Sequence, residues 1–183
     1  NQRGTLVLWA DDNAAPWTGP VKLFATAKVG ETTLRREIRA FCRVANQVGS
    51  RETREHVFAV REKSPFQMSI EPERLSVEAG QKAEVKLRLV RNWADFKNAV
   101  NYQPLNFPGQ FQLGNGTINA DQNEVTISIM VQAGTRPADY SLVVLGLGQV
   151  PFNKDATKPD KPNTLVSIPS RPLTITVTEA PKK

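Results

Sequence analysis

Nucleophilic catalysis and zinc binding both depend on histidine and cysteine, and this chain has one of each, His56 and Cys42. A catalytic triad needs an activated nucleophile beside a base, and a structural zinc site needs about four nitrogen or sulfur ligands. His56 opens an apolar run, Val57–Val60, and no Gly-x-Ser-x-Gly motif marks a nucleophile elbow. The sequence therefore predicts no enzymatic activity, no cofactor and no zinc site.

Carboxylates are the remaining groups that could hold a metal ion, in this case calcium. Asp121, Asn123 and Glu124 precede a predicted strand, and Asp155 and Asp160 lie in a long loop. Neither group has EF-hand spacing, and turn formation explains Asp121 to Asn123 equally well. Calcium binding stays open as an alternative that the sequence does not favour.

Positive charge is the next feature that could select a partner, because 24 Lys and Arg residues outnumber 18 Asp and Glu residues. Much of the excess falls in one stretch: Arg35, Arg36, Arg39, Arg43, Arg51 and Arg54. A nucleic-acid-binding surface would interleave aromatic residues or glycines with these cations, and only Phe41 does so. We therefore expect a solvated strand face and no nucleic-acid partner; an anionic polysaccharide or a lipid headgroup is the alternative.

Alternation of apolar and polar residues predicts the elements that position these groups. Ala83–Leu89, Val125–Val131 and Leu173–Val177 alternate with period two, which indicates strands with one buried and one solvated face. Leu34 to Val44 alternates in the same way, placing Leu34, Ile38 and Cys42 on an apolar face and predicting a buried Cys42 thiol. No convincing helical period runs over ten residues, and no apolar stretch approaches the ~20 residues that span a membrane.

Strands can be assigned along the whole chain from Pro65 onward. They are Phe66–Ile70, Leu75–Val77, Ala83–Arg91, Ala99–Leu105, Phe111–Leu113, Gly116–Asn119, Val125–Gln132, Tyr140–Val150 and Leu165–Val177. Such strands in about 115 residues predict an all-β fold, an immunoglobulin-like antiparallel β-sandwich. Tyr140–Val150 is apolar on both faces, which indicates a strand covered on both sides, and Gly146 and Gly148 would admit a close neighbour.

An internal repeat organises the domains. Residues Leu6–Val29 match Ile127–Val150 without a gap, as in a tandem array of small β-domains. We predict that residues 1–63 are the C-terminal part of one β-sandwich, 65–179 a complete one and 180–183 a tail. The first part would then hold strands at Thr5–Ala10, Val21–Val29, Thr33–Val44 and His56–Arg61. Its earlier strands would precede Asn1, or else its strands would pack on the second domain as one larger sheet.

Two local patterns predict specific contacts. Tyr140 stands two residues before Leu142, the spacing at which a tyrosine closes the corner of an immunoglobulin domain by bonding back to the chain. Asn115-Gly116-Thr117 is a glycosylation sequon, but Asn-Gly is also the strongest hairpin signal, and we expect a hairpin turn.

Aromatic and basic residues at one end of the predicted sandwich form a candidate contact surface. Trp93 and Phe96 lie in the turn after the second strand, which in this topology shares an end with the Phe152 loop. The candidate residues are Trp93, Phe96, Phe152, Lys154, Lys158 and Lys161. The alternative is that Trp93 caps the core.

Three segments, Gly19–Arg39, Phe58–Phe96 and Gln132–Asp155, together resemble a known class of sequence. Their motifs are Arg-x-Trp-x-Asp-Phe at Arg91–Phe96, Pro-x-x-Tyr at Pro137–Tyr140 and Pro-Phe-Asn-Lys-Asp at Pro151–Asp155. The chain resembles the tandem immunoglobulin-like β-sandwich regions of large bacterial secreted proteins, often found beside pre-peptidase C-terminal-type domains.

The resemblance implies an extracytoplasmic location (secreted, cell-surface or periplasmic) and a spacer, adhesive or scaffolding role. Expected partners are neighbouring domains of the same chain, other envelope proteins or a glycan, and no catalytic residue carries over. Two alternatives stay open: an accessory domain of an extracellular hydrolase, and a filament or surface-layer subunit assembling by strand complementation.

Overall fold

The protein is built of strands alone in the part of the chain that the structure describes. The computed structural model describes residues 5–38, 41–43, 50–52, 55–155 and 157–179, which contain seventeen strands and no helix. No part of these residues forms an apolar helix of membrane-crossing length. The predicted all-β fold is confirmed.

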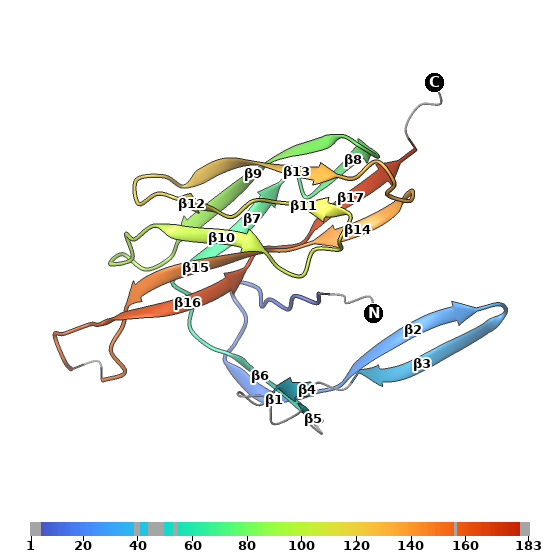
Figure 1. Ribbon diagram of the computed structural model, residues 1–183. Helices are drawn as coiled ribbons and strands as arrows, with labels where there is room; N and C mark the ends of the chain where they lie inside the picture. The colour runs from blue at the N-terminus through green and yellow to red at the C-terminus, as the bar shows by residue number, and fades with distance from the viewer. Residues whose placement is uncertain (1–4, 39–40, 44–49, 53–54, 156, 180–183) are drawn as a thin grey trace. The chain divides into compact units, whose positions relative to one another are not determined.

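Two compact units divide the chain (Figure 1). The large unit comprises Lys63–Lys183 together with Asn1–Trp9, and the small unit comprises Ala10–Glu62. Each unit is described by itself below.

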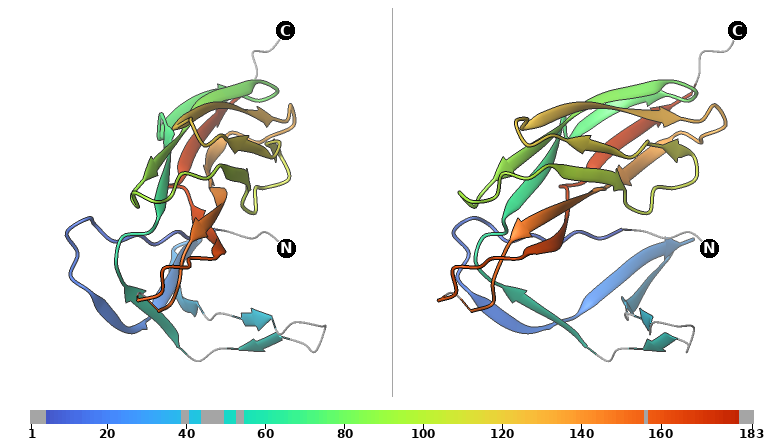
Figure 2. Two further views of the ribbon diagram at one scale, coloured as in Figure 1. Left: turned by 90° about the vertical axis from the view of Figure 1, so that its left-hand side faces the viewer. Right: turned by 60° about the vertical axis from the view of Figure 1, so that its left-hand side comes forward.

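Three sheets make up the large unit. One has the order β11 (Phe111–Gln112), β13 (Glu124–Val131), β9 (Lys82–Arg91), β7 (Phe66–Glu71), and all its pairs are antiparallel. The second has the order β12 (Gly116–Ile118), β10 (Val100–Pro104), β15 (Val144–Pro151), β16 (Asn163–Pro169). The third has the order β14 (Ala138–Leu142), β17 (Leu173–Thr178), β8 (Arg74–Glu78), with β17 and β8 parallel. Figure 2 shows the strands of this unit from two further sides.

A continuous hydrophobic core lies between these sheets. Every second residue of β9 is buried, from Ala83 to Leu89, as the alternation predicts. Phe66 and Met68 of β7 meet β15 where that strand carries Gly146 and Gly148. A Cβ at Gly148 would lie 2.8 Å from Phe66 Cε1, and a Cβ at Gly146 would collide with Met68 Sδ. The two glycines thus allow the close approach that the sequence indicates.

Two of the predicted strands each divide in two. Tyr140–Val150 becomes β14 and β15, and Leu165–Val177 becomes β16 and β17. Both change sheets at one level, where the Ser170 amide donates to the Val144 carbonyl at 2.7 Å and Ser170 Oγ accepts from the Val144 amide at 3.1 Å. In Tyr140–Val150 the change is invisible to a periodicity argument because Val143 lies within an apolar run, whereas in Leu165–Val177 the prolines Pro169 and Pro172 flank it.

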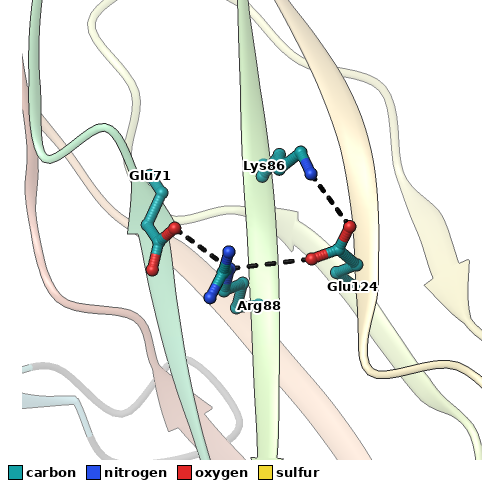
Figure 3. A network of polar contacts seen from close by, with 4 residues as sticks. All are labelled: Glu71, Lys86, Arg88 and Glu124. Carbon is teal, nitrogen blue, oxygen red and sulfur yellow. Dashed lines mark hydrogen bonds and ion pairs between the residues drawn. The ribbon is translucent and has the colours of Figure 1, made fainter.

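The solvated face of the first sheet carries charge pairs (Figure 3). Lys86 Nζ lies 3.0 Å from Glu124 Oε1, and Arg88 Nε lies 3.0 Å from Glu71 Oε2 and 3.6 Å from Glu124 Oε2. These residues come from β7, β9 and β13, so the network ties the outer face of three adjacent strands.

The described residues of the small unit form three separate two-stranded antiparallel sheets. They are β1 (Trp17–Val21) with β6 (His56–Val60), β2 (Leu23–Val29) with β3 (Thr32–Ile38), and β4 (Phe41–Arg43) with β5 (Ser50–Glu52). None of its side chains whose exposure is described is buried.

Several expectations for this region need correction. Thr5–Ala10 is not a strand: Leu6 and Leu8 alternate but are exposed, and they pair with no described strand. Leu34 and Ile38 share a face, as expected, yet they are 44% and 42% exposed because no described strand of the small unit covers that face of β3. The predicted burial of Cys42 and the tail at 180–183 lie outside what the structure describes.

Candidate functional site

The Arg91–Phe96 motif holds the start of the candidate surface in place. The Arg91 guanidinium donates from Nη1 to the Asn98 carbonyl at 2.6 Å and from Nη2 to the Asn119 carbonyl at 3.2 Å. It also lies 5.1 Å from the centre of the Phe96 ring, and burial lowers the pKa of Arg91. Arg91 thus joins the end of β9 to two loops by satisfying their backbone carbonyls.

The two aromatic residues of this motif have different environments. Phe96 is 1% exposed and stacks on Phe66 with ring centres 5.3 Å apart. Because it belongs to the core, Phe96 is removed from the candidate contact surface. Trp93 is half-buried against the core, and its indole Nε1 donates to the Lys63 carbonyl at 2.9 Å. Trp93 therefore caps the core, the alternative given above, while part of its ring stays accessible.

The Phe152 loop meets the Trp93 turn at the same end of the large unit, as predicted. The Trp93 and Phe152 ring centres are 6.3 Å apart. Lys161 Nζ donates to Asp95 Oδ2 at 2.7 Å, and this hydrogen bond holds the pKa of Asp95 below its ordinary value. A polar link and an aromatic contact therefore both connect the turn to the loop.

Hydrogen bonds within the loop give it a defined shape. The Phe152 amide donates to the Pro162 carbonyl at 3.1 Å, and Asn153 Nδ2 donates to the Asp160 carbonyl at 2.6 Å. Asp155 Oδ1 accepts from the Thr157 hydroxyl at 2.7 Å and from its amide at 3.1 Å, which lowers the pKa of Asp155.

Five side chains remain at this end and define what we call the loop-end surface: Trp93, Phe152, Lys154, Lys158 and Lys161. Phe152 is 45% exposed and the three lysines are exposed. Because Lys161 is paired with Asp95, the arrangement offers an aromatic face beside the positive charges of Lys154 and Lys158, which suits a partner with apolar and anionic groups.

Three of the residues considered for catalysis or metal binding make contacts within the fold. His56 Nε2 lies 3.1 Å from the Ile38 carbonyl oxygen, and Glu124 pairs with Lys86 and Arg88. Asp155 accepts hydrogen bonds from Thr157. Within the described ranges, no three His, Cys, Asp or Glu side chains gather as metal ligands would.

Two local predictions have different outcomes. The Tyr140 hydroxyl donates to the Arg136 carbonyl at 2.9 Å and Leu142 is buried, so the predicted tyrosine corner is confirmed. The predicted hairpin turn at Asn115-Gly116 is wrong, because β11 and β12 belong to different sheets. Gly116 instead pairs with Tyr102 in the β10–β12 ladder, and its lack of a side chain makes room for the Tyr102 ring.

Sequence reasoning missed Ser170, the buried hydroxyl at the level where strands change sheets. A serine between Pro169 and Arg171 reads as an ordinary loop residue. The only signal in the sequence was the pair of prolines, Pro169 and Pro172, which interrupt an otherwise continuous strand pattern.

Comparisons with known proteins add little to this picture. No protein-family model and no curated protein sequence matches the chain significantly. Among solved structures, domains 4 and 5 of the S-layer protein SbsC are similar at 17% identity and a TM-score of 0.33, over 87% of this chain and 58% of that one. The bacterial superantigen toxic shock syndrome toxin-1 is similar at 10% identity and a TM-score of 0.33, over 62% of this chain and 99% of that one. The chain thus spans less than two thirds of the S-layer fragment, and both scores are too low to assign a shared fold or function.

Proposed function

We propose that the chain is a non-enzymatic module of a tandem array of immunoglobulin-like β-sandwiches in a large secreted or cell-surface bacterial protein, where it acts as a spacer that bears tension. The observation that carries the spacer role is the parallel pairing of β8 with β17. β8 is the second strand of the large unit and β17 its last, so the pair joins the two ends of the unit.

The geometry of that pair suits a load between the ends of the chain. Its register runs from Arg74 opposite Thr174 to Glu78 opposite Thr178. Backbone hydrogen bonds extend it on both sides, from the Thr174 amide to Glu73 at 2.9 Å and from the Ala79 amide to Thr178 at 3.1 Å. Tension would pull β8 and β17 lengthwise past one another, so their hydrogen bonds would carry the load together and not one after another.

Strand order supports the immunoglobulin-like part of the proposal. If β7, β9, β10, β11, β13, β15 and β16 are read as strands A to G, the first sheet has the order D-E-B-A and the second contains C-F-G. An immunoglobulin constant-type domain has the same strand orders, ABED in one sheet and CFG in the other. The secreted or surface location rests on the sequence resemblance.

Single-molecule pulling in two directions tests the spacer role. The large unit is held in one experiment by cysteines introduced at Glu62 and Glu179, exposed positions before β7 and after β17. In the other it is held by cysteines introduced at Glu73 and Arg171, two exposed positions at the same end of β8 and β17. A Cys42→Ser background keeps the attachment unique. The first direction shears the pair and the second opens it one residue pair at a time, so we expect a higher rupture force for the large unit in the first. Equal forces would refute the load-bearing role. Because the two variants differ only in their exposed attachment points, a difference in force reports on the pulling direction.

The loop-end surface favours a second candidate function, adhesion to an anionic glycan. Phe152→Ser is expected to weaken binding of the chain to immobilised anionic polysaccharide at low salt. Leu165→Ser is the matched control, because Leu165 is 59% exposed on β16 but lies outside the loop-end surface. Equal binding by both variants and the unaltered chain would refute the adhesive role, and only the spacer role would remain.

A further inference from the structure

The small unit repeats four strands of the large unit. β1 and β14 begin 121 positions apart, and so do β2 and β15, so the two strand breaks coincide at Lys22 and Val143. The sequence repeat predicted related strands, and the structure adds that their ends agree.

Pairing is repeated as well. β1 pairs β6 with Val21 opposite His56, and β14 pairs β17 with Leu142 opposite Leu173; in both, the end of the first strand meets the start of the second. β2 pairs β3 with Val29 opposite Thr32, as β15 pairs β16 with Val150 opposite Thr164. Strands β1, β2, β3 and β6 therefore correspond in order, direction and register to β14, β15, β16 and β17.

The strands that cover this set in the large unit have no counterpart among the described strands of the small unit. β15 pairs with β10 along its second edge, and β17 pairs with β8 along its second edge. β2 pairs only with β3, and β6 only with β1. Each of these two strands thus has one edge of backbone donors and acceptors with no paired strand among the described residues.

The face of β2 that corresponds to the buried face of β15 also has no cover among the described residues of the small unit. Val150 is 0% exposed, whereas Val29, its counterpart, is 61% exposed. Ala25 and Ala27 are exposed at the positions of Gly146 and Gly148, which in the large unit lie beneath Met68 and Phe66. Small residues at these positions fit large apolar side chains from a facing strand. On the other face of β2, the Phe24 ring already has a partner within the hairpin, since the Arg35 guanidinium lies 3.8 Å from its centre.

We infer that the small unit is an acceptor for a polypeptide segment of the same repeat type, lying outside residues 1–183 and carrying counterparts of β7 to β13. A two-stranded sheet is marginally stable alone, and the large unit contains the pattern of what would complete it. One donated strand pairs antiparallel with β2, with its central residue opposite Ala25 as Tyr102 is opposite Gly146. Another pairs parallel with β6, as β8 does with β17. Large apolar residues of a third cover Ala25 and Ala27. This inference is independent of the proposed spacer function.

Two measurements on the unaltered chain come first. Sedimentation gives its oligomeric state, and hydrogen exchange gives the protection of the β1, β2 and β3 amides. We expect a monomer in which these amides exchange as in a frayed hairpin. Protected amides in a monomer would overturn the inference, because the large unit would then be the cover. Protected amides in a dimer would overturn it in favour of a second copy.

The decisive variant supplies the predicted segment. A second copy of residues 64–131 replaces residues 1–10. The last strand of the added copy is then followed by Asp11, just as β13 is followed by Gln132, the counterpart of Asp11, in the large unit. We expect exchange of the β2 amides to slow by about a hundredfold or more, the change from a frayed to a core strand. The same chimera with Val85→Asp and Leu87→Asp in the added copy has equal length but no core, and should give no protection. Absence of protection in the intact chimera would overturn the inference.

A pair of substitutions then tests the register. Ala25→Gln with Ala27→Gln fills the space reserved for the facing strand and should abolish the gained protection. Thr26→Gln with Lys28→Gln changes the opposite face of the same strand and should leave it in place. An equal effect of both pairs would show that the donated segment does not cover the predicted face, and would refute the proposed arrangement.

Discussion

The contact between Gly146 and Met68 gives the sharpest test of how the large unit packs. A Cβ at Gly146 would collide with Met68 Sδ and lie 3.2 Å from Phe66 Cε2, both in the buried core. Adding one methyl group to a filled core costs about 1–3 kcal/mol in the free energy of unfolding. Gly146→Ala should therefore destabilise the large unit by that amount.

A double-mutant cycle separates this clash from a general intolerance of substitution. Met68→Ala alone removes a buried side chain and should cost about 2–5 kcal/mol. In the double variant the new methyl group occupies part of the space that Met68 leaves. The costs of the two single variants should therefore add up to at least about 1 kcal/mol more than the cost of the double variant. Residues in contact show interaction free energies of about 0.5–3 kcal/mol in such cycles.

Urea unfolding followed through the amide signals of Val85 and Ile129 reports on the large unit alone. Gly114→Ala is the control, since a Cβ there would meet no atom within 4 Å. Additive costs in the double variant, or equal effects of Gly146→Ala and Gly114→Ala, would refute the reasoning from close packing.

Three further predictions concern single polar groups. Tyr140→Phe removes the hydrogen bond to the Arg136 carbonyl and should cost about 0.5–1.5 kcal/mol, measured by urea unfolding. Ser170→Ala leaves the Val144 amide without its hydroxyl acceptor and should cost about 1–3 kcal/mol in the same assay. The hydrogen bond from a lysine lowers the pKa of Glu124, so its contribution to stability is present above the pKa of the unfolded chain and is lost as pH falls through the folded value. The stability difference between the unaltered protein and Glu124→Gln, followed by unfolding from pH 7 to about 3, should therefore shrink toward the acid end.

Each of these has a control or a contradicting result. Ser167→Ala, at an exposed position of β16, should have almost no effect. A Tyr140→Phe variant as stable as the parent would mean that the corner is held by ring packing on Phe111 alone, whose ring centre is 4.9 Å away. A Glu124→Gln difference that does not change with pH would show that the lysine contact does not stabilise the folded state.

The large unit could be predicted well because its core imposes period two on its strands. Ala83–Leu89 alternates in sequence and in burial, and the Tyr140 corner follows from a spacing of two residues. The change of sheet at Val143 could not be predicted, because the apolar run continues through it; at Ser170 the only signal was the pair of flanking prolines, Pro169 and Pro172. The burial of Phe96 was missed because its position in a turn does not indicate which way its side chain points.

In the small unit the sequence pattern gave wrong predictions, because the pattern of a buried face is present where no described layer buries it. Leu34 and Ile38 alternate with polar residues as the residues of a buried face do, but the described residues do not cover them. At Leu6 and Leu8, alternation over so few residues was not enough to make a strand, since a strand also needs a neighbour for its backbone.

The change of sheet at Val143 and Ser170 has a consequence for how the large unit comes apart. Two neighbouring stretches of chain run from β14 into β15 and from β16 into β17, so continuous backbone joins the second and third sheets at this level. Separating these two sheets would require both stretches to release their partners at once. The second and third sheets should accordingly unfold together, without an intermediate that keeps one of the two intact.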